Sequence, residues 1–580
     1  PESNPTIRIR GVTTMSNNDP LVIVDGVVGN LEDVNTEDVE NITVLKDAAS
    51  ASIYGSRAAA GVILITTKRA KSNDLKMSYN FEFGLDYIPT HPRTVGPERI
   101  MEFANETRYN DNPTAGTFQT YAEDLINNYR QLNKEDPNTY PLVNDWFQEV
   151  FNKVGPKHSH TLNISGGTKY VKTNASLSYD KVDAMYDNRD YERIMLRVNN
   201  TFTINKYIGA DLDFNFKHDA INKPYQTKDL YEKAITMWPT YGAYYTDGRL
   251  AMGRPGGGDN PIACLYDSGT EQIWNTIVGG RASLYLTPLD GLKISGIVAP
   301  RYIFTKKKAF QKAMPWTSYE DPNTIGGYRW GYTTTNLNEE RNDFYDITAQ
   351  VIINYMKRFG KHDVNVMGGY EGYYTKYENL KAGREQYLIS DYPYLDMGPT
   401  TYRTNGGGAT EQSYRSWFGR IAYGYADRYL VQANIRRDAS SRFHKDHRWG
   451  NFPSFSAGWV ISEEPFMKDA GLDWLSYLKV RGSWGILGNE RISSNYYPYQ
   501  AAINFSTALF FQNGGVISSQ SASQWAYAVQ DLTWEKTAST DIGVDVNFFD
   551  NRLRFTAEWF KKKTSDMLLA TSIPAYVGFD

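Results

Sequence analysis

Apolar and polar residues alternate along many segments of this chain. Residues 78–88 read SYNFEFGLDYI, and the same period of two returns in 207–217, 343–356 and 537–548. Successive side chains of a β-strand point to opposite faces, so each segment predicts a strand with one apolar and one polar face. The segments run to roughly ten residues or more, enough to cross a bilayer at a tilt, whereas strands of soluble sheets are usually about five to six residues long.

The spacing of these segments predicts a barrel. Fifteen strands are expected, near 78–88, 159–167, 171–180, 192–204, 207–217, 277–287, 292–304, 343–356, 363–375, 414–426, 429–437, 453–461, 477–486, 537–548 and 552–562. Joins after even-numbered strands are mostly short and joins after odd-numbered strands are mostly long. The exceptions are a modest loop near 181–191 and a long join near 462–476. Short turns on one rim and long loops on the other are typical of outer-membrane β-barrels.

An odd number of strands predicts that the barrel continues beyond this chain. Bacterial single-chain barrels usually have an even number of strands, and plugged transporters have about 22. We therefore expect roughly seven more strands after Asp580. The first residues, PESNPTIRIRG, have neither the apolar core nor the cleavage site of a signal peptide.

Residues 18–68 have a different pattern, which predicts a small α+β unit. A short apolar strand, Leu21 to Val24, precedes an Asp25-Gly26 turn, and 61–67 predicts a β-branched strand. The intervening residues 48–54 are small and compact. A unit of this size buries too little surface to be stable alone, so it is expected to pack against something larger.

The same stretch carries a resemblance to a known family. Two segments resemble the second half of the plug domain of TonB-dependent outer-membrane transporters, and their sequences are most similar to the SusC-like subfamily. They are DPLVIVDGV (19–27) and DVENITVLKDAASASIYGSRAAAGVILITTK (38–68). Two further segments, within 428–459 and 532–543, resemble the barrel signature of that subfamily. The residues of the plug signature are Asp25, Gly26, Lys46, Asp47, Tyr54, Gly55, Arg57 and Gly61.

The resemblance implies a mainly β fold: an antiparallel transmembrane β-barrel of the 22-stranded type with a small α+β N-terminal plug. Residues 1–72 would be the C-terminal half of the plug domain, and residues 76–580 the barrel with long extracellular loops. The implied function is import of large nutrients across the outer membrane, with oligosaccharides or oligopeptides as ligands. The implied partners are outer-membrane lipid, a SusD-like surface lipoprotein over the loops, and TonB, which would act through a segment before Pro1.

Two other classes of function remain as alternatives. A passive porin or a surface-binding barrel without energy coupling would share the strand pattern, but porins lack an N-terminal plug, so residues 1–70 argue against it. A soluble all-β carbohydrate-binding protein would also show alternating strands, although shorter ones.

The composition excludes several structural features and partners. The chain has 580 residues and a net charge of −4, which implies no nucleic-acid partner. Its single cysteine, Cys264, allows no internal disulfide. No apolar run approaches the 18 or more residues of a membrane helix, so only a barrel would let this chain span a membrane.

Aromatic residues are abundant in the predicted loops and are the candidate ligand contacts. Aromatic faces beside polar groups suit stacking on sugar rings or contact with peptide side chains. The alternative is that they form the interfacial girdles of the barrel or pack the loops. The candidates are Trp238, Tyr241, Tyr244, Trp274, Trp316, Tyr328 and Trp330.

Charged residues suggest little further chemistry. His444, Asp446 and His447 lie together but lack the spacing of a common zinc site, and acidic loop residues lack a calcium-binding motif, so no metal or cofactor is expected. No sequence motif of an enzyme occurs, so catalysis is not expected. Lys46-Asp47 and Arg57 are candidates for ion pairs between plug and barrel wall.

Overall fold

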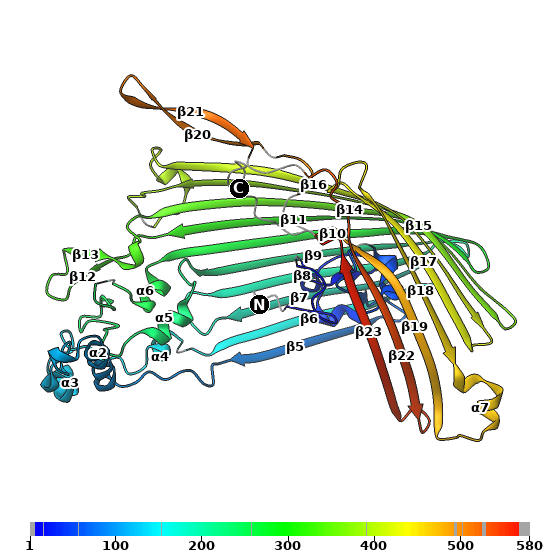
Figure 1. Cartoon of the computed structure of the whole chain (residues 1–580), viewed down its shortest axis with the longest axis horizontal. Helices are drawn as coiled ribbons and strands as arrows, with labels where there is room; N and C mark the ends of the chain where they lie inside the picture. Colours follow the sequence, from blue (N-terminus) through cyan, green and yellow to red (C-terminus); the bar gives the residue numbers. More distant parts are fainter. Residues whose placement is uncertain are drawn as a thin grey trace.

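The structure is a computed structural model, which describes residues 6–15, 17–55, 57–151, 153–256, 258–389, 391–491, 496–501, 503–524 and 529–567. Its main feature is one antiparallel sheet of fifteen strands that curves around a small plug (Figure 1). Each strand pairs with the next main-sheet strand along the chain, so the sheet is a series of hairpins with β5 and β23 at its two edges. This architecture confirms the predicted fold class.

The strands of the main sheet have the following bounds. They are β5 (Lys76–Asp86), β6 (Gly155–Gly167), β7 (Val171–Asp183), β8 (Asp190–Thr203), β9 (Ile208–Pro224), β10 (Gly269–Leu289), β11 (Leu292–Gln311), β14 (Asn336–Phe359), β15 (His362–Arg384), β16 (Arg403–Tyr425), β17 (Tyr429–Ser440), β18 (Trp449–Val460), β19 (Leu475–Asn489), β22 (Glu535–Phe548) and β23 (Leu553–Ser565).

Every predicted strand has one counterpart in the sheet, but several predicted bounds were wrong at the long-loop end. The strand predicted at 414–426 begins at Arg403 in β16, and the one predicted at 277–287 begins at Gly269 in β10. The added part of β16 reads RTNGGGATEQS, which is polar on both faces. Where neither face meets an apolar surface, alternation disappears although ladder hydrogen bonds continue, so the pattern underestimates strand length.

The long connections contain most of the helices, and Figure 1 shows them gathered at one end of the sheet. They are α2 (Pro97–Asp111), α3 (Glu123–Glu135), α4 (Trp146–Val150), α5 (Leu230–Thr236) and α6 (Pro261–Tyr266). The first two lie in the long loop predicted between the strands at 78–88 and 159–167. Two small hairpins that the pattern missed lie in predicted loops: β12 (Pro315–Thr317) with β13 (Ile325–Tyr328), and β20 (Ile503–Gln512) with β21 (Gly515–Gln524). Another helix, α7 (Pro465–Asp469), lies at the opposite end of the main sheet (Figure 1).

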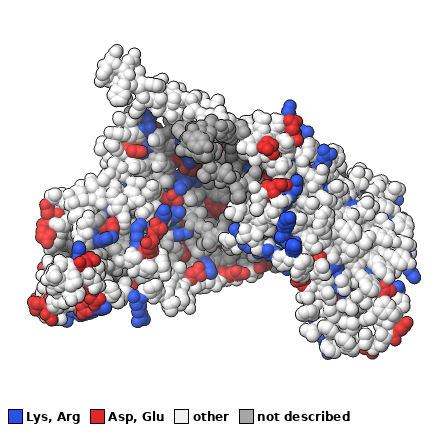
Figure 2. Space-filling model, in the orientation of Figure 1, with Lys and Arg blue, Asp and Glu red and all other residues white. Residues whose placement is uncertain are grey.

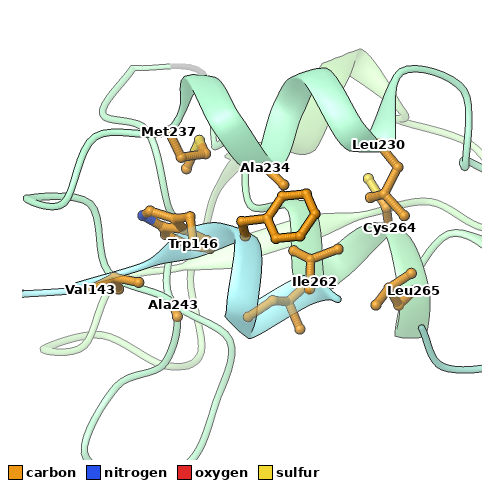
Figure 3. Close-up of a cluster of buried hydrophobic side chains, with 11 residues drawn as sticks. Val143, Trp146, Leu230, Ala234, Met237, Ala243, Ile262, Cys264 and Leu265 are labelled. Carbon is orange, nitrogen blue, oxygen red and sulfur yellow. The ribbon is translucent and has the colours of Figure 1, made fainter. Parts of the chain in front are cut away.

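The loop helices have a hydrophobic core of their own. Trp146 and Phe147 of α4 pack against Leu230 of α5 and Ile262 of α6, all of them buried (Figure 3). The indole nitrogen of Trp146 donates a hydrogen bond to the carbonyl oxygen of Trp238 at 3.0 Å. This core holds the long loops in a defined arrangement.

The plug is a second, four-stranded sheet with a short helix. Its elements are β1 (Leu21–Val24), β2 (Val27–Val28), β3 (Val39–Leu45), α1 (Ala48–Ala51) and β4 (Val62–Thr67). The sheet order is β2-β1-β4-β3, with β1 parallel to β4. Figure 1 shows the plug within the curve of the main sheet, in the half away from helices α2–α6.

The outer face of the main sheet is apolar. Along β11, Val298 and Tyr302 point outward and are about half exposed, whereas Arg301 points inward and pairs with the buried Asp346 of β14 at 2.6 Å. In Figure 2 the right-hand lobe is largely free of charge, and many charged side chains gather around the central hollow and at the left end. Apolar-out and polar-in alternation is the pattern of a membrane barrel. Among the described helices, none is both long and apolar enough to cross a membrane.

Candidate functional site

The plug signature begins with a turn. Asp25 and Gly26 join β1 to β2 with φ angles of 49° and 89°, a left-handed conformation that Asp tolerates and Gly adopts freely. The Asp25 carboxylate accepts hydrogen bonds from the backbone nitrogen (2.9 Å) and the hydroxyl (2.7 Å) of Thr67. These two hydrogen bonds connect the turn to the last residue of β4.

Lys46 and Asp47 lie at the start of α1 and do not act as predicted. The Asp47 carboxylate accepts a hydrogen bond from the backbone nitrogen of Ser50 at 2.8 Å, so it caps the helix. The Lys46 side chain is exposed. Within the part of the chain that the structure describes, neither residue forms an ion pair with the wall. The Asp47 carboxylate is bound instead by a free amide at the start of its own helix.

Tyr54, Gly55 and Gly61 shape the surface of the plug. A side chain at Gly55, where φ is 99°, would meet the guanidinium of Arg436 at 3.1 Å, and one at Gly61 would meet Ile9 at 2.8 Å. Both glycines are therefore needed for close packing. Tyr54 lines a cavity of about 640 Å³ between plug and wall, together with Leu45, Asp47 and residues near the short turns.

One face of the plug, the charged face, presents Asp25, Asp33 and Asp38 to β8–β11. The aspartates form ion pairs with the wall: Arg197 with Asp38 (3.8 Å), Lys217 with Asp33 (3.5 Å) and Arg301 with Asp33 (3.6 Å). These distances exceed those of direct hydrogen bonds. At the end of β4 the contacts are shorter, because Arg69 donates to Asp213 of β9 at 2.5 Å and Asn199 of β8 donates to the carbonyl oxygen of Lys68 at 3.0 Å. A cavity of about 70 Å³ lies among Arg197, Arg301 and Asp33, large enough for water.

The opposite face, the uncharged face, packs α1 and residues 52–55 against β17–β19. The Asn434 side chain donates to the carbonyl oxygen of Ala49 at 3.1 Å, and the hydroxyls of Ser454 and Ser52 are 2.9 Å apart. Arg436 donates to the carbonyl oxygen of Ile53 at 2.5 Å. Its charge is matched within the wall by Asp438 at 2.7 Å and Glu371 at 3.1 Å. This face therefore makes several direct hydrogen bonds to the wall, beside the cavity of about 640 Å³ that Ala49, Ser50 and Tyr54 line.

Arg57 contacts the barrel wall, although not through the predicted ion pair. Its guanidinium lies over the rings of Tyr373 and Tyr414, 4.9 Å from each centroid. It forms part of a cavity of about 510 Å³, here called the plug chamber. The lining residues are Asn17, Arg57, Phe344, Tyr373, Thr375, Gln412, Tyr414, Arg442, Glu490, Arg491 and Tyr496.

Glu490 is the only acidic residue among the described lining residues of the plug chamber. It is 2% exposed and accepts hydrogen bonds from Gln412 at 2.9 Å and from Ser440 at 2.5 Å. Burial raises the pKa of Glu490 to about 7, against the opposing attraction of Arg57. Sequence reasoning missed this residue, because nothing local distinguishes it from the other carboxylates of the chain.

Three of the seven candidate aromatic residues line one cavity among the long loops. Trp238 and Tyr241 are stacked with ring centroids 5.6 Å apart, and Trp330 lies across the same cavity of about 280 Å³. Lys233 lies over the Trp330 ring at 5.0 Å. Arg254 and Asp259 complete an arrangement of flat rings with charged groups.

The other four candidates lie elsewhere. Trp274 belongs to β10 and shares its outward face with Val278, under Lys306 at 4.7 Å. Trp316 packs on the glycines of its own β12–β13 hairpin, where Tyr328 pairs with Pro315. Tyr244 is about half exposed in the loop that precedes α6.

No cluster of three or more metal-ligating side chains occurs among the residues that the structure describes. His444 and Asp446 are 3.3 Å apart and form a local pair.

Comparisons with known proteins match the two structural parts. Residues 1–62 match the TonB-dependent receptor plug domain, and residues 299–579 match the TonB-dependent receptor-like β-barrel. The chain is 29% identical over its whole length to TonB-dependent receptor P39 of Formosa agariphila and 27% identical to TonB-dependent receptor SusC of Bacteroides thetaiotaomicron. It spans 52% and 57% of those proteins.

Solved structures show the same fold. The RagAB peptide transporter gives a TM-score of 0.80 at 22% identity, covering 99% of this chain and 64% of that chain. The RagAB peptide importer in its 'closed-closed' state gives 0.82, with the same coverage and identity.

The curved sheet, apolar outside and enclosing a plug, defines the class of plugged outer-membrane barrels. The plug and barrel matches, with relatives that include SusC, show that the chain belongs to the TonB-dependent receptor family. Its place is therefore the outer membrane.

Proposed function

We propose that the protein imports oligosaccharides or oligopeptides across the outer membrane and is energised by TonB. The observation that carries this proposal is the way the plug is held. On one face, wall side chains donate directly to plug carbonyl groups, whereas on the other face the plug aspartates form longer ion pairs beside a cavity that can hold water. Such a plug closes the barrel, yet part of its interface can be loosened by force.

No ATP is available at the outer membrane, so the energy for import must be supplied from elsewhere in the cell. In the proposal, residues 1–72 form part of the plug and 76–580 part of the barrel, and TonB pulls on the plug. A SusD-like lipoprotein would cover the long loops. One solved structure with this fold is described as a peptide transporter, and this supports a large organic cargo.

Ligand contact is proposed for the loop cavity of Trp238, Tyr241 and Trp330, since flat rings with charged groups suit a polar cargo. Trp274 is more consistent with an interfacial girdle, because it lies on the outward face. The mechanism requires no metal, cofactor or catalytic step.

The alternative is a passive porin or a surface-binding barrel. The two functions are distinguished by uptake of labelled oligosaccharides and oligopeptides into cells that express the full-length protein, with and without TonB. We expect uptake that is lost without TonB and without the protein. Uptake that persists without TonB would overturn the energised importer in favour of the passive barrel.

A further inference from the structure

The plug chamber has an excess of positive charge. Arg57, Arg442 and Arg491 line it with Glu490 as the only acidic partner among the described lining residues, and guanidinium groups stay protonated at neutral pH. The raised pKa of Glu490 reduces its negative charge further. Among the described lining residues, cations therefore outnumber anions by three to one.

Two of the arginines are held in position by aromatic rings. Arg57 is fixed by the rings of Tyr373 and Tyr414, and Arg442 lies 4.6 Å over the ring of Tyr496. Stacking on a ring leaves the N–H groups at the edge of a guanidinium available. Among the described residues, neither Arg57 nor Arg491 forms an ion pair or donates a side-chain hydrogen bond.

Guanidinium groups bind carboxylates and sulfates through short, charge-assisted hydrogen bonds. Three of them, contributed by the plug and by two different loops, surround a space of about 510 Å³. This volume falls within the usual range of about 300–1,000 Å³ for ligand pockets.

The rest of the lining indicates which kind of anion fits. Phe344 is the only described lining side chain without a polar atom, and the others carry amide, hydroxyl or charged groups. A sugar ring presents hydroxyl groups around its edge that can exchange hydrogen bonds with these side chains, whereas an apolar peptide side chain would find few apolar partners here. We propose that the plug chamber binds an acidic sugar unit, carrying a carboxylate or sulfate, of an oligosaccharide cargo.

This inference rests on the proposed import function and adds a role for Arg57. Because Arg57 belongs to the plug and its tyrosine partners to the wall, a bound anion would contact both parts at once. Cargo would then be recognised where plug and wall meet.

Calorimetry on the purified full-length protein tests the proposal, using a panel of uronate and sulfated oligosaccharides, each with its neutral counterpart, and tetraglutamate. We expect at least one acidic oligosaccharide to bind at least tenfold more tightly than its neutral counterpart and than tetraglutamate. Tighter binding of tetraglutamate, or no preference for acidic sugars across the panel, would overturn the proposal.

Variants locate the site. Arg57→Gln and Arg491→Gln should each weaken acidic-sugar binding at least tenfold, while Arg99→Gln, at an exposed arginine of α2, should not change it. Arg491 contributes no side-chain hydrogen bond among described residues, so its variant tests binding even if Arg57→Gln disturbs the plug. Unchanged binding in Arg491→Gln would place the anion elsewhere. Binding is measured without TonB, so failure of the import function would leave this result interpretable.

Discussion

Toward β8–β11 the plug presents three aspartates, whereas toward β17–β19 it presents a short helix of alanines and serines. On the charged face, the aspartates form ion pairs of 3.5–3.8 Å beside a cavity, and Lys217 and Arg301 also have acidic partners within the wall. On the uncharged face, Asn434 and Arg436 donate directly to carbonyl groups of α1 and residues 52–55. We therefore expect the aspartate contacts to loosen more easily than the contacts of α1 and residues 52–55.

The largest expected effect concerns Arg436 on the uncharged face. Arg436→Met removes the donor to Ile53 and the cation that pairs with Asp438 and Glu371, so it should destabilise the seated plug by about 3–5 kcal/mol. Hydrogen–deuterium exchange of residues 48–54 in the full-length protein measures this change. Arg437→Met is the matched control, since Arg437 points outward over Trp449. Equal exchange in both variants would contradict the assignment of this face as the tight one.

A side chain at Gly485 should have the next largest effect. A β-carbon there would lie 2.5 Å from that of Ser454 and 2.9 Å from that of Ala48, so Gly485→Val should cost about 1–3 kcal/mol by overpacking. Gly406→Val is the control, because nothing lies within 4 Å of a β-carbon at that position. Urea-dependent proteolysis of the plug compares the two variants. If Gly406→Val loosens the plug as much, close packing at Gly485 is not the cause.

The charged face should tolerate loss of a partner. Asp33→Asn should change plug stability by no more than about 1 kcal/mol, because Lys217 keeps Asp219 at 3.1 Å and Arg301 keeps Asp346 at 2.6 Å. The matched substitution on the other face, Asp438→Asn, should have a larger effect, since it weakens the pairing of Arg436. The same exchange measurement tests both, and a larger effect of Asp33→Asn would reverse the comparison.

The smallest expected effect is a pH dependence on the charged face. Burial raises the pKa of Asp38 above its usual value of 3.8, despite opposing effects of Ser176, Arg197 and Lys68. The folded state then binds the proton more tightly than the unfolded chain, so the contribution of Asp38 to stability increases as pH falls through the raised pKa. Thermal unfolding between pH 4 and pH 8 should show a slope in the native protein that is reduced in Asp38→Asn. An unchanged slope would mean that Asp38 is not the responsible group.

The strand pattern was predictable because the bilayer requires it. Within the apolar band every second side chain must be apolar, so the sequence located all fifteen strands of the main sheet. Beyond that band, as in residues 403–413 of β16, hydrogen bonds continue without alternation and the sequence contains no signal. The turn at Asp25-Gly26 was predictable for a local reason, since only a few residue types adopt positive φ.

The candidate site was predictable only in part. Arg57 was identified through a resemblance, but its predicted ion pair was replaced by two tyrosines, and Asp47 was used by its own helix. Trp238, Tyr241 and Trp330 converge on one cavity, whereas Trp274 lies outside the barrel wall. Aromatic content alone does not distinguish a loop cavity from an outward face.

The sequence by itself determined the barrel wall, the plug and the family, because period-two alternation, turn residues and a contiguous plug segment are local properties. Tertiary structure alone decided which charges meet. Arg57 and Glu490 are far apart in the chain, yet they line the same chamber. Alternation shows only whether a side chain points inward or outward; which residue stands opposite depends on how the sheet curves around the plug.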